Sequence, residues 1–275
     1  RQILARLEQE LIHNVALRVD NTEDPDKFKC AGRGELHLSI LIETMRREGY
    51  ELAVSRPQVI IKEIDGVRSE PYEAVIVDIE EQHQGSIMEA LAERKGKIKN
   101  MMPDGKGRIR LDYIMPTRGL IGFHTEFLTQ TSGTGLMYHV FDHFGPAIDQ
   151  DIGARRSGAL ISNALGKATG YSLFNLQERG KLCIGPQTDV YEGMIVGFHN
   201  RANDLVVNVI RPKQLTNVRA SGTDENIILT PPLRMTLEQA LEYINDDELV
   251  EVTPVNLRLR KKFLKENERK RGGRV

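Results

Sequence analysis

The tripeptide Gly166-Lys167-Ala168 is the segment of this sequence closest to nucleotide chemistry, because a glycine followed by a lysine ends a phosphate-binding loop. In such a loop a Ser or Thr follows the lysine and holds magnesium, and a further glycine opens the loop. Here those two positions hold Ala168 and Ile161. The pattern therefore fails twice, and we predict that this chain neither binds nor hydrolyses GTP.

The other candidate catalytic or metal-binding side chains lack the partners that their chemistry needs. His139 and His143 are spaced as two metal ligands on a helix would be, but residues 137–144 alternate like a strand and no third ligand stands at a suitable spacing. Ser157 and Ser162 lie outside any Gly-x-Ser-x-Gly turn. The two cysteines form no metal-binding or disulfide pattern. We expect no catalytic residue, metal site or cofactor in this chain.

Basic residues in the last part of the chain are interleaved with glycine and other small residues. Lysine and arginine neutralise phosphate charge, and small residues let the backbone approach RNA closely. Aromatic residues are few there, which favours recognition of RNA backbone and shape over base stacking. From the residues alone, a scatter of solvated charges explains the pattern equally well. The candidate RNA-binding residues are Arg155, Arg156, Lys167, Arg179, Lys181, Arg211, Lys213 and Arg219.

Two glycine-bearing turns could also offer backbone N–H groups to phosphate. They are Gly119-Leu120-Ile121-Gly122 and Ser132-Gly133-Thr134-Gly135. Ordinary turn chemistry explains both equally simply.

The segment 1–68 predicts the element order helix, strand, strand, helix, strand. Apolar residues recur at helical spacing in 3–11 and 36–48, and strand patterns follow at 15–19, 28–31 and 50–54. This is a split βαβ unit without its leading strand. Because Arg1 also stands where an initiator Met is expected, we expect the chain to be cut from a longer protein.

The segment 69–148 predicts the same plan with its leading strand present. Residues 72–80 alternate, Ser86 and Glu89 form a capping-box pattern, and 98–102 and 108–115 flank a Pro-Asp-Gly turn. A helix over 117–130 and a strand over 136–144 complete a βαββαβ order. The fold class is therefore α+β, with two tandem ferredoxin-like domains, the first lacking its leading strand.

The segment 149–275 predicts a mixed, sheet-centred domain. Short strand patterns occur at 188–191, 194–199, 205–209 and 250–253, and Thr236 with Gln239 forms a capping box. Residues 215–232 are polar, lack periodicity and end in two prolines, which indicates a long exposed loop with Arg219 at its centre. We expect this loop to be mobile without RNA.

Composition indicates a folded protein of the cytoplasm. The 275 residues carry a formal net charge of −1, but the stretch from Arg258 to Arg274 holds nine basic and two acidic residues. No stretch is long and apolar enough for a spanning helix, and no signal peptide pattern opens the chain.

Several motifs make the sequence resemble a known family. Gly32-Arg33-Gly34-Glu35-Leu36-His37-Leu38, followed by Pro57-Gln58-Val59, is similar to domain III of elongation factor G and its relatives. Five further motifs resemble the BipA/TypA translational GTPases, and the resemblance covers essentially the whole chain. These motifs are Pro116-Thr117-Arg118-Gly119-Leu120-Ile121-Gly122-Phe123, the run 130–135, His143-Phe144-Gly145-Pro146, Ala164-Leu165-Gly166-Lys167-Ala168-Thr169-Gly170-Tyr171 and Leu215-Thr216-Asn217-Val218-Arg219-Ala220-Ser221-Gly222-Thr223.

The resemblance implies a set of expectations about organisation and function. Residues 1–68, 69–148 and 149–275 would correspond to domain III, to a domain like elongation factor G domain V, and to the BipA/TypA-specific C-terminal domain. The chain would be the ribosome- and rRNA-binding part of a GTPase involved in ribosome assembly, translation and stress adaptation, with GTP and magnesium held in an N-terminal domain outside this chain. The acceptor end of an A-site tRNA is a further expected partner, whereas membrane and DNA are not. The alternative is a stand-alone regulatory protein whose paired ferredoxin-like domains bind a metabolite.

Overall fold

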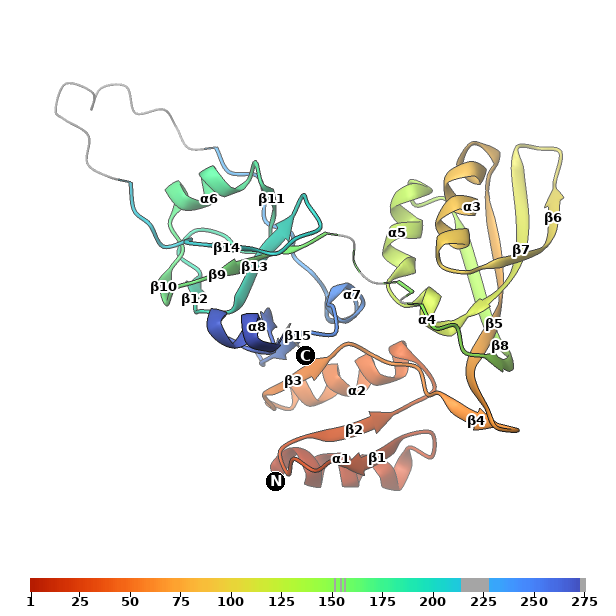
Figure 1. Cartoon of the computed structure of the whole chain (residues 1–275), viewed down its shortest axis with the longest axis horizontal. Helices are drawn as coiled ribbons and strands as arrows, with labels where there is room; N and C mark the ends of the chain where they lie inside the picture. The colour runs from red at the N-terminus through yellow and green to blue at the C-terminus, as the bar shows by residue number, and fades with distance from the viewer. Residues whose placement is uncertain (151, 154, 156, 214–227, 273–275) are drawn as a thin grey trace. The chain divides into compact units, whose positions relative to one another are not determined.

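The computed structural model of the chain describes residues 1–150, 152, 153, 155, 157–213 and 228–272. These residues form two compact units (Figure 1). One unit comprises residues 57–155, and the other combines 1–56 with 156–275. Each unit is described separately below, and the boundaries at 68 and 148 stay a prediction.

The unit 57–155 confirms the expected βαββαβ order. Its strands are β4 (Lys62–Ile64), β5 (Val67–Glu80), β6 (Lys97–Pro103), β7 (Arg108–Pro116) and β8 (Leu136–Pro146), and its helices are η1 (Glu81–His83), α3 (Gln84–Glu93), α4 (Thr117–Leu120) and α5 (Phe123–Gln130). The antiparallel sheet runs β8-β5-β7-β6, and β4 pairs with the start of β5. This is the strand order of a ferredoxin-like domain.

The core of this unit follows from the alternation in its strands. Val75, Val77 and Ile79 project from one face of β5 and are fully buried or nearly so. They pack with Ile87 of α3 and Phe127 of α5, so both helices cover the same face of the sheet. The sequence pattern therefore predicted the buried face correctly.

Two local predictions in this unit are wrong. The helix expected over 117–130 is divided into α4 and α5, because Gly122 takes a left-handed conformation with φ of 74°. The second helix, α5, begins at the next residue. The expected capping box at Ser86 does not form, since α3 already begins at Gln84 and the Ser86 hydroxyl donates to the carbonyl of His83.

The N-terminal residues of the other unit contain the expected elements. They are α1 (Gln2–His13), β1 (Arg18–Asn21), β2 (Phe28–Ala31), α2 (Glu35–Arg47) and β3 (Leu52–Ser55). The hairpin of β1 and β2 forms a separate two-stranded sheet. Gly49 lies two residues after α2 with φ of 96°, a left-handed conformation that is common just after the end of a helix.

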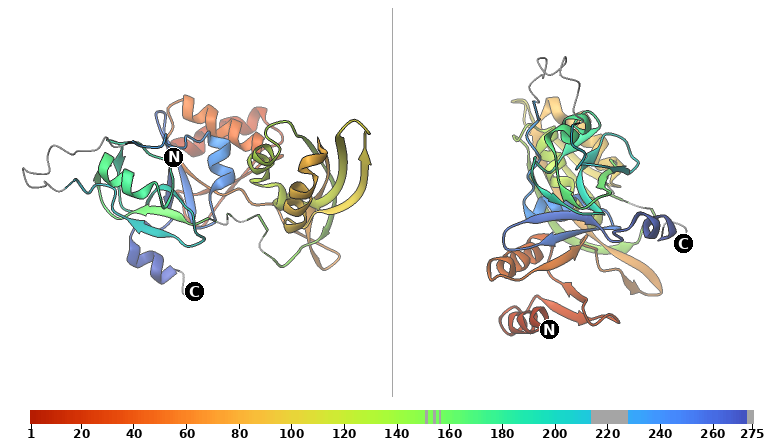
Figure 2. Two further views of the ribbon diagram at one scale, coloured as in Figure 1. Left: turned by 90° about the horizontal axis from the view of Figure 1, so that it is seen from above. Right: turned by 90° about the vertical axis from the view of Figure 1, so that its left-hand side faces the viewer.

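The third strand of this N-terminal segment joins a sheet built by the last part of the chain. β3 pairs with β15 (Glu248–Val252), with Val54 opposite Val250. The helices α2 and α7 (Leu237–Tyr243) lie side by side (Figures 1 and 2). Arg46 reinforces the contact by donating to the carbonyl of Thr253 at 3.0 Å. The strand edge that the sequence left without a partner is thus covered by β15.

The C-terminal part of this unit is sheet-centred, as expected. Its other elements are β9 (Ala159–Ser162), β10 (Gly166–Lys167), α6 (Gly170–Leu176), β11 (Gly180–Leu182), β12 (Asp189–Val190), β13 (Met194–His199), β14 (Leu205–Val207), β16 (Leu257–Lys261) and α8 (Glu266–Gly272). The main sheet runs β14-β9-β13-β16-β15-β3, and β11 pairs with β13. β10 and β12 form a separate pair. The capping box of Thr236 and Gln239 at the start of α7 is confirmed.

Lys261, which counted as part of a basic tail in the sequence, is buried within this sheet. Its ammonium group lies 2.7 Å from a carboxylate oxygen of Asp204, 2.7 Å from Asp247 and 2.9 Å from Glu248. Burial alone would lower the pKa of Lys261, but the surrounding carboxylates, Glu248 above all, raise it. This lysine therefore serves the fold and is not available to a partner.

Candidate nucleic-acid interface

The helix α6 is the element around which the described candidate RNA-binding residues gather. Its first turn is capped by the hydroxyl of Thr169, which accepts a hydrogen bond from the N–H of Ser172 at 3.2 Å. The hydroxyls of Thr169 and Ser172 also donate to the carbonyl of Arg211, each at 2.7 Å. The start of α6 is thus tied to the segment that follows β14.

These bonds bring Lys167 and Arg211 to the same end of α6. Lys167 lies on β10, two residues before the cap, and Arg211 is held by the hydroxyls of the cap itself. Both residues are exposed, as is Lys213 two positions further on. Ala168, the residue after Lys167, is fully buried in an apolar cluster, so the position where a phosphate-binding loop would carry Ser or Thr is part of the core here.

Arg179 and Lys181 lie near the opposite end of α6. Arg179 lies three residues after the last residue of α6, and its N–H donates to the carbonyl of Leu176 at 2.9 Å. Lys181 lies at the centre of β11, where its neighbours Gly180 and Leu182 are buried and its own side chain is exposed. Neither cation forms an ion pair with a residue that the structure describes.

The remaining candidates do not join this group in the same way. Arg155 belongs to the other unit and is half-buried, with interactions of its own. Arg156 and Arg219 lie outside the described residues, as does most of the predicted loop 215–232. The described set around α6 therefore consists of Lys167, Arg179, Lys181, Arg211 and Lys213.

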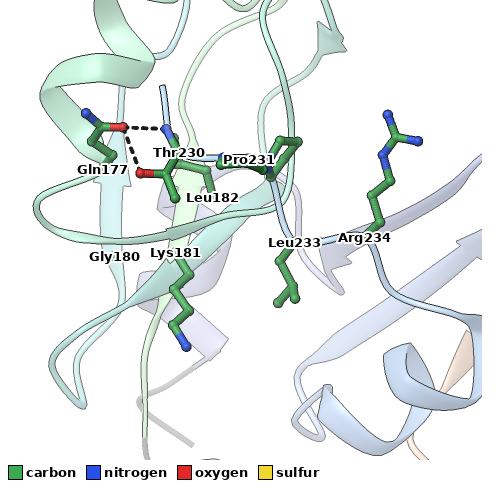
Figure 3. Close-up of a pocket in the computed structure, with 9 residues that line it drawn as sticks. Gln177, Gly180, Lys181, Leu182, Thr230, Pro231, Leu233 and Arg234 are labelled. Carbon is green, nitrogen blue, oxygen red and sulfur yellow. Dashed lines mark hydrogen bonds between the residues drawn. The ribbon is translucent and has the colours of Figure 1, made fainter. Parts of the chain in front are cut away.

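A pocket next to this set contains a residue that sequence reasoning missed. It is lined by Gln177, Gly180, Lys181, Leu182, Thr230, Pro231, Pro232, Leu233 and Arg234 and has a volume of about 360 Å³. The amide oxygen of Gln177 accepts from the N–H of Thr230 at 3.0 Å and from its hydroxyl at 3.3 Å (Figure 3). Arg234 is exposed and borders the pocket, but it stands outside the glycine-rich runs that marked the other candidates.

Close packing explains one glycine in each of the two glycine turns of the unit 57–155. A Cβ at Gly119 would lie 2.7 Å from the carbonyl oxygen of Arg94. The guanidinium of Arg94 in turn donates to the carbonyls of Gly119 and Ile121 at 2.9 and 3.1 Å. Gly135 is likewise pressed against Phe127. Close packing accounts for these glycines without a phosphate.

His139 and His143 on β8 each contact a carboxylate. Nδ1 of His139 lies 2.5 Å from Glu73, and Nδ1 of His143 lies 2.6 Å from Asp142. Burial would raise the pKa of Glu73, but the hydrogen bonds that Glu73 accepts, chiefly from His139, together with the charge of His139 lower it. Within the described part of the chain, no three His, Cys, Asp or Glu side chains are grouped to hold a metal ion.

Comparison with known proteins decides the family. Residues 157–266 match the TypA/BipA C-terminal domain, and residues 67–152 match the elongation factor G C-terminus. All 275 residues align at 64% identity with the large ribosomal subunit assembly factor BipA of Escherichia coli (strain K12), covering 45% of that protein. The chain belongs to the BipA/TypA family.

Other BipA relatives are equally similar. The large ribosomal subunit assembly factors BipA of Salmonella typhimurium and Haemophilus influenzae are 64% and 63% identical over the whole chain. In each case the chain spans 45% of the relative's length and corresponds to its C-terminal part. None of the described helices is long and apolar enough to cross a membrane.

Proposed function

We propose that this chain is the part of a BipA/TypA GTPase that binds the ribosome and its RNA during assembly of the large subunit. The observation that carries the proposal is the 63–64% identity, over the whole chain, to proteins named large ribosomal subunit assembly factors. The exposed cations around α6 supply a chemistry suited to RNA phosphates. The C-terminal part of the unit that combines residues 1–56 and 156–275 is therefore the proposed site of RNA contact. Ribosomal RNA and the acceptor end of an A-site tRNA are the proposed RNA partners.

Co-sedimentation with purified large ribosomal subunits tests this function. We expect the chain to pellet with the subunits at low salt. The logarithm of the binding affinity should fall linearly with the logarithm of the salt concentration, because binding releases the salt cations condensed on the RNA. Serum albumin under the same conditions is the control for trapping in the pellet. A chain that stays in the supernatant at every salt concentration would refute the proposal.

We further propose that GTP and magnesium are bound outside this chain, and that the whole protein works in the cytoplasm. Ala168 and Ile161 remove the two features of a phosphate-binding loop, and Ala168 is fully buried. A titration with a fluorescent GTP analogue should show no binding at micromolar concentrations. Saturable micromolar binding would overturn this assignment.

A further inference from the structure

The pocket beside β11 exists because two prolines keep the neighbouring segment off the edge of that strand. The residues just before and just after β11 bond toward β13: the N–H of Cys183 donates to the carbonyl of Val196, and the carbonyl of Arg179 accepts from the N–H of Asn200. By the alternation of an antiparallel ladder, the backbone groups of Gly180 and Leu182 then face the outer edge.

The segment 230–234 runs along that outer edge but contacts it through one described backbone bond. The N–H of Leu233 donates to the carbonyl of Leu182 at 2.8 Å. Pro231 and Pro232 have no N–H to offer, so the two residues before Leu233 cannot donate to the ladder. At the other end of the segment 230–234, Gln177 accepts a hydrogen bond from Thr230 (Figure 3). The pocket lies between this bond and the bond from Leu233 to Leu182.

The walls and the rim of this pocket differ in chemistry. Its walls come largely from Leu182, Pro231, Pro232 and Leu233, and Leu233 remains 39% exposed. Its rim carries Lys181 and Arg234, which extend in opposite directions in the view of Figure 3. Neither forms an ion pair with a described residue. The volume of about 360 Å³ lies within the range of roughly 300–1,000 Å³ that is typical of small-ligand pockets.

We propose that this pocket binds one unpaired RNA nucleotide, with its base against the proline and leucine walls and its two flanking phosphates near Lys181 and Arg234. The proposal rests on the proposed RNA-binding function and names the form of RNA that this site selects. An apolar slot suits the flat face of a base, and cations that diverge suit successive phosphates of a strand better than a single phosphate. A duplex keeps its bases stacked and cannot enter.

An extended peptide is the competing occupant, because the outer edge of β11 could pair with an added strand. Two features favour RNA. The prolines on the opposite wall offer no N–H to a peptide, and both rim charges are positive, which complements a phosphate backbone. The experiment must therefore distinguish RNA from a peptide as the occupant of the pocket.

The experiment measures binding of a fluorescein-labelled single-stranded adenine hexanucleotide and of a 12-base-pair RNA duplex by fluorescence anisotropy, using the whole chain. Leu233→Trp fills the pocket without changing the charge, and Lys181→Ala removes one rim cation. We expect Leu233→Trp to weaken binding of the single strand about tenfold, the loss of one stacked base, and to change duplex binding less than about twofold. Lys181→Ala should weaken binding of both RNAs. Lys106→Ala, which removes an exposed cation from the turn between β6 and β7, is the matched charge control.

The outcomes separate this proposal from the proposed function. If Leu233→Trp, shown to be folded by circular dichroism, binds the single strand as tightly as the unchanged chain, the pocket does not hold a nucleotide, even where the chain still sediments with large subunits. If Lys181→Ala weakens binding of the hexanucleotide no more than Lys106→Ala does, Lys181 does not contact the RNA at the rim of the pocket. Photo-crosslinking of a 4-thiouridine hexamer should label the peptide that contains Lys181 or Leu233. Labelling confined to other peptides would also overturn the proposal.

Discussion

Arginine serves the fold in the unit 57–155, whereas the cations around α6 face solvent. Arg94, Arg108 and Arg118 each bond a carboxylate and at least one backbone carbonyl within their own unit. Arg179, Lys181 and Arg211 are exposed, and none forms an ion pair with a described residue. The same residue types therefore stabilise one region and leave charge available for a partner in the other.

Arg118 shows how strongly the first region depends on its internal cations. Its guanidinium bonds both carboxylate oxygens of Glu70, at 2.6 and 3.1 Å, and Glu70 is fully buried. Arg118 also donates to the carbonyls of Ile148 and Gln150, and Glu70 accepts from the N–H of Ile148. The pair thus fixes the chain where it leaves β8.

The largest expected effect comes from breaking this pair. Arg118→Ala should lower the free energy of unfolding by about 3–5 kcal/mol, because it leaves the charge of Glu70 buried without its partner. Chemical denaturation followed by circular dichroism measures the loss. Arg110→Ala is the control, since its pair with Asp112 is more exposed and should contribute about 1 kcal/mol or less. Equal losses in the two variants would contradict the contrast between the regions.

Removing two cations near α6 should act on binding and leave stability nearly unchanged. The double variant Arg179→Ala, Arg211→Ala should weaken binding to large ribosomal subunits about tenfold, equivalent to 1.4 kcal/mol. The slope of log affinity against log salt should become shallower by about 2, one for each lost phosphate contact. Co-sedimentation over a salt series measures both quantities. An unchanged slope would mean that these two residues do not contact phosphate.

The helix caps offer a smaller and more selective test. Thr169→Ala and Thr236→Ala each remove a capping hydroxyl and should each lower the unfolding free energy by about 1 kcal/mol. Only Thr169→Ala should also weaken RNA binding, because the Thr169 hydroxyl holds the carbonyl of Arg211. Parallel denaturation and RNA titrations compare the two variants. Equal RNA affinities would show that the cap does not position the cations.

The smallest expected effect is a pH dependence in the unit 57–155. The pKa of Glu73 is lowered in the folded state, so its contribution to stability is present above the unfolded pKa, near 4.3, and is lost as pH falls through the folded value. Glu73→Gln should therefore reduce the drop in unfolding free energy between pH 6 and pH 3. Glu89→Gln, an exposed carboxylate on α3, is the control for general charge loss. A Glu73→Gln profile parallel to that of the unchanged chain would contradict the assignment.

Sequence reasoning predicted the parts of the fold that depend on local periodicity. Strict alternation over 72–80 identified the buried face of β5, and the apolar spacing of 36–48 identified α2, whose observed span is Glu35–Arg47. The same approach missed β10 and β11, which are defined by pairing with β12 and β13, and α6, whose start is fixed by the Thr169 cap and the contact with Arg211. It listed the exposed cations Lys167, Arg179, Lys181 and Arg211 but not Arg234, which has no glycine-rich neighbourhood.

The sequence by itself determined the family, the main helices and strands of residues 1–148 apart from β4 and the break at Gly122, and the failure of the nucleotide pattern at Ile161 and Ala168. Tertiary structure alone decided that β3 completes the sheet of β15, that Lys261 is buried among carboxylates, and that Arg118 pairs with Glu70, 48 residues away in the chain. The physical reason is that periodicity reports which face of an element is apolar. It does not report which distant strand will pair with an element or which distant charge will bond to its side chains, since the packing of the whole chain selects these partners.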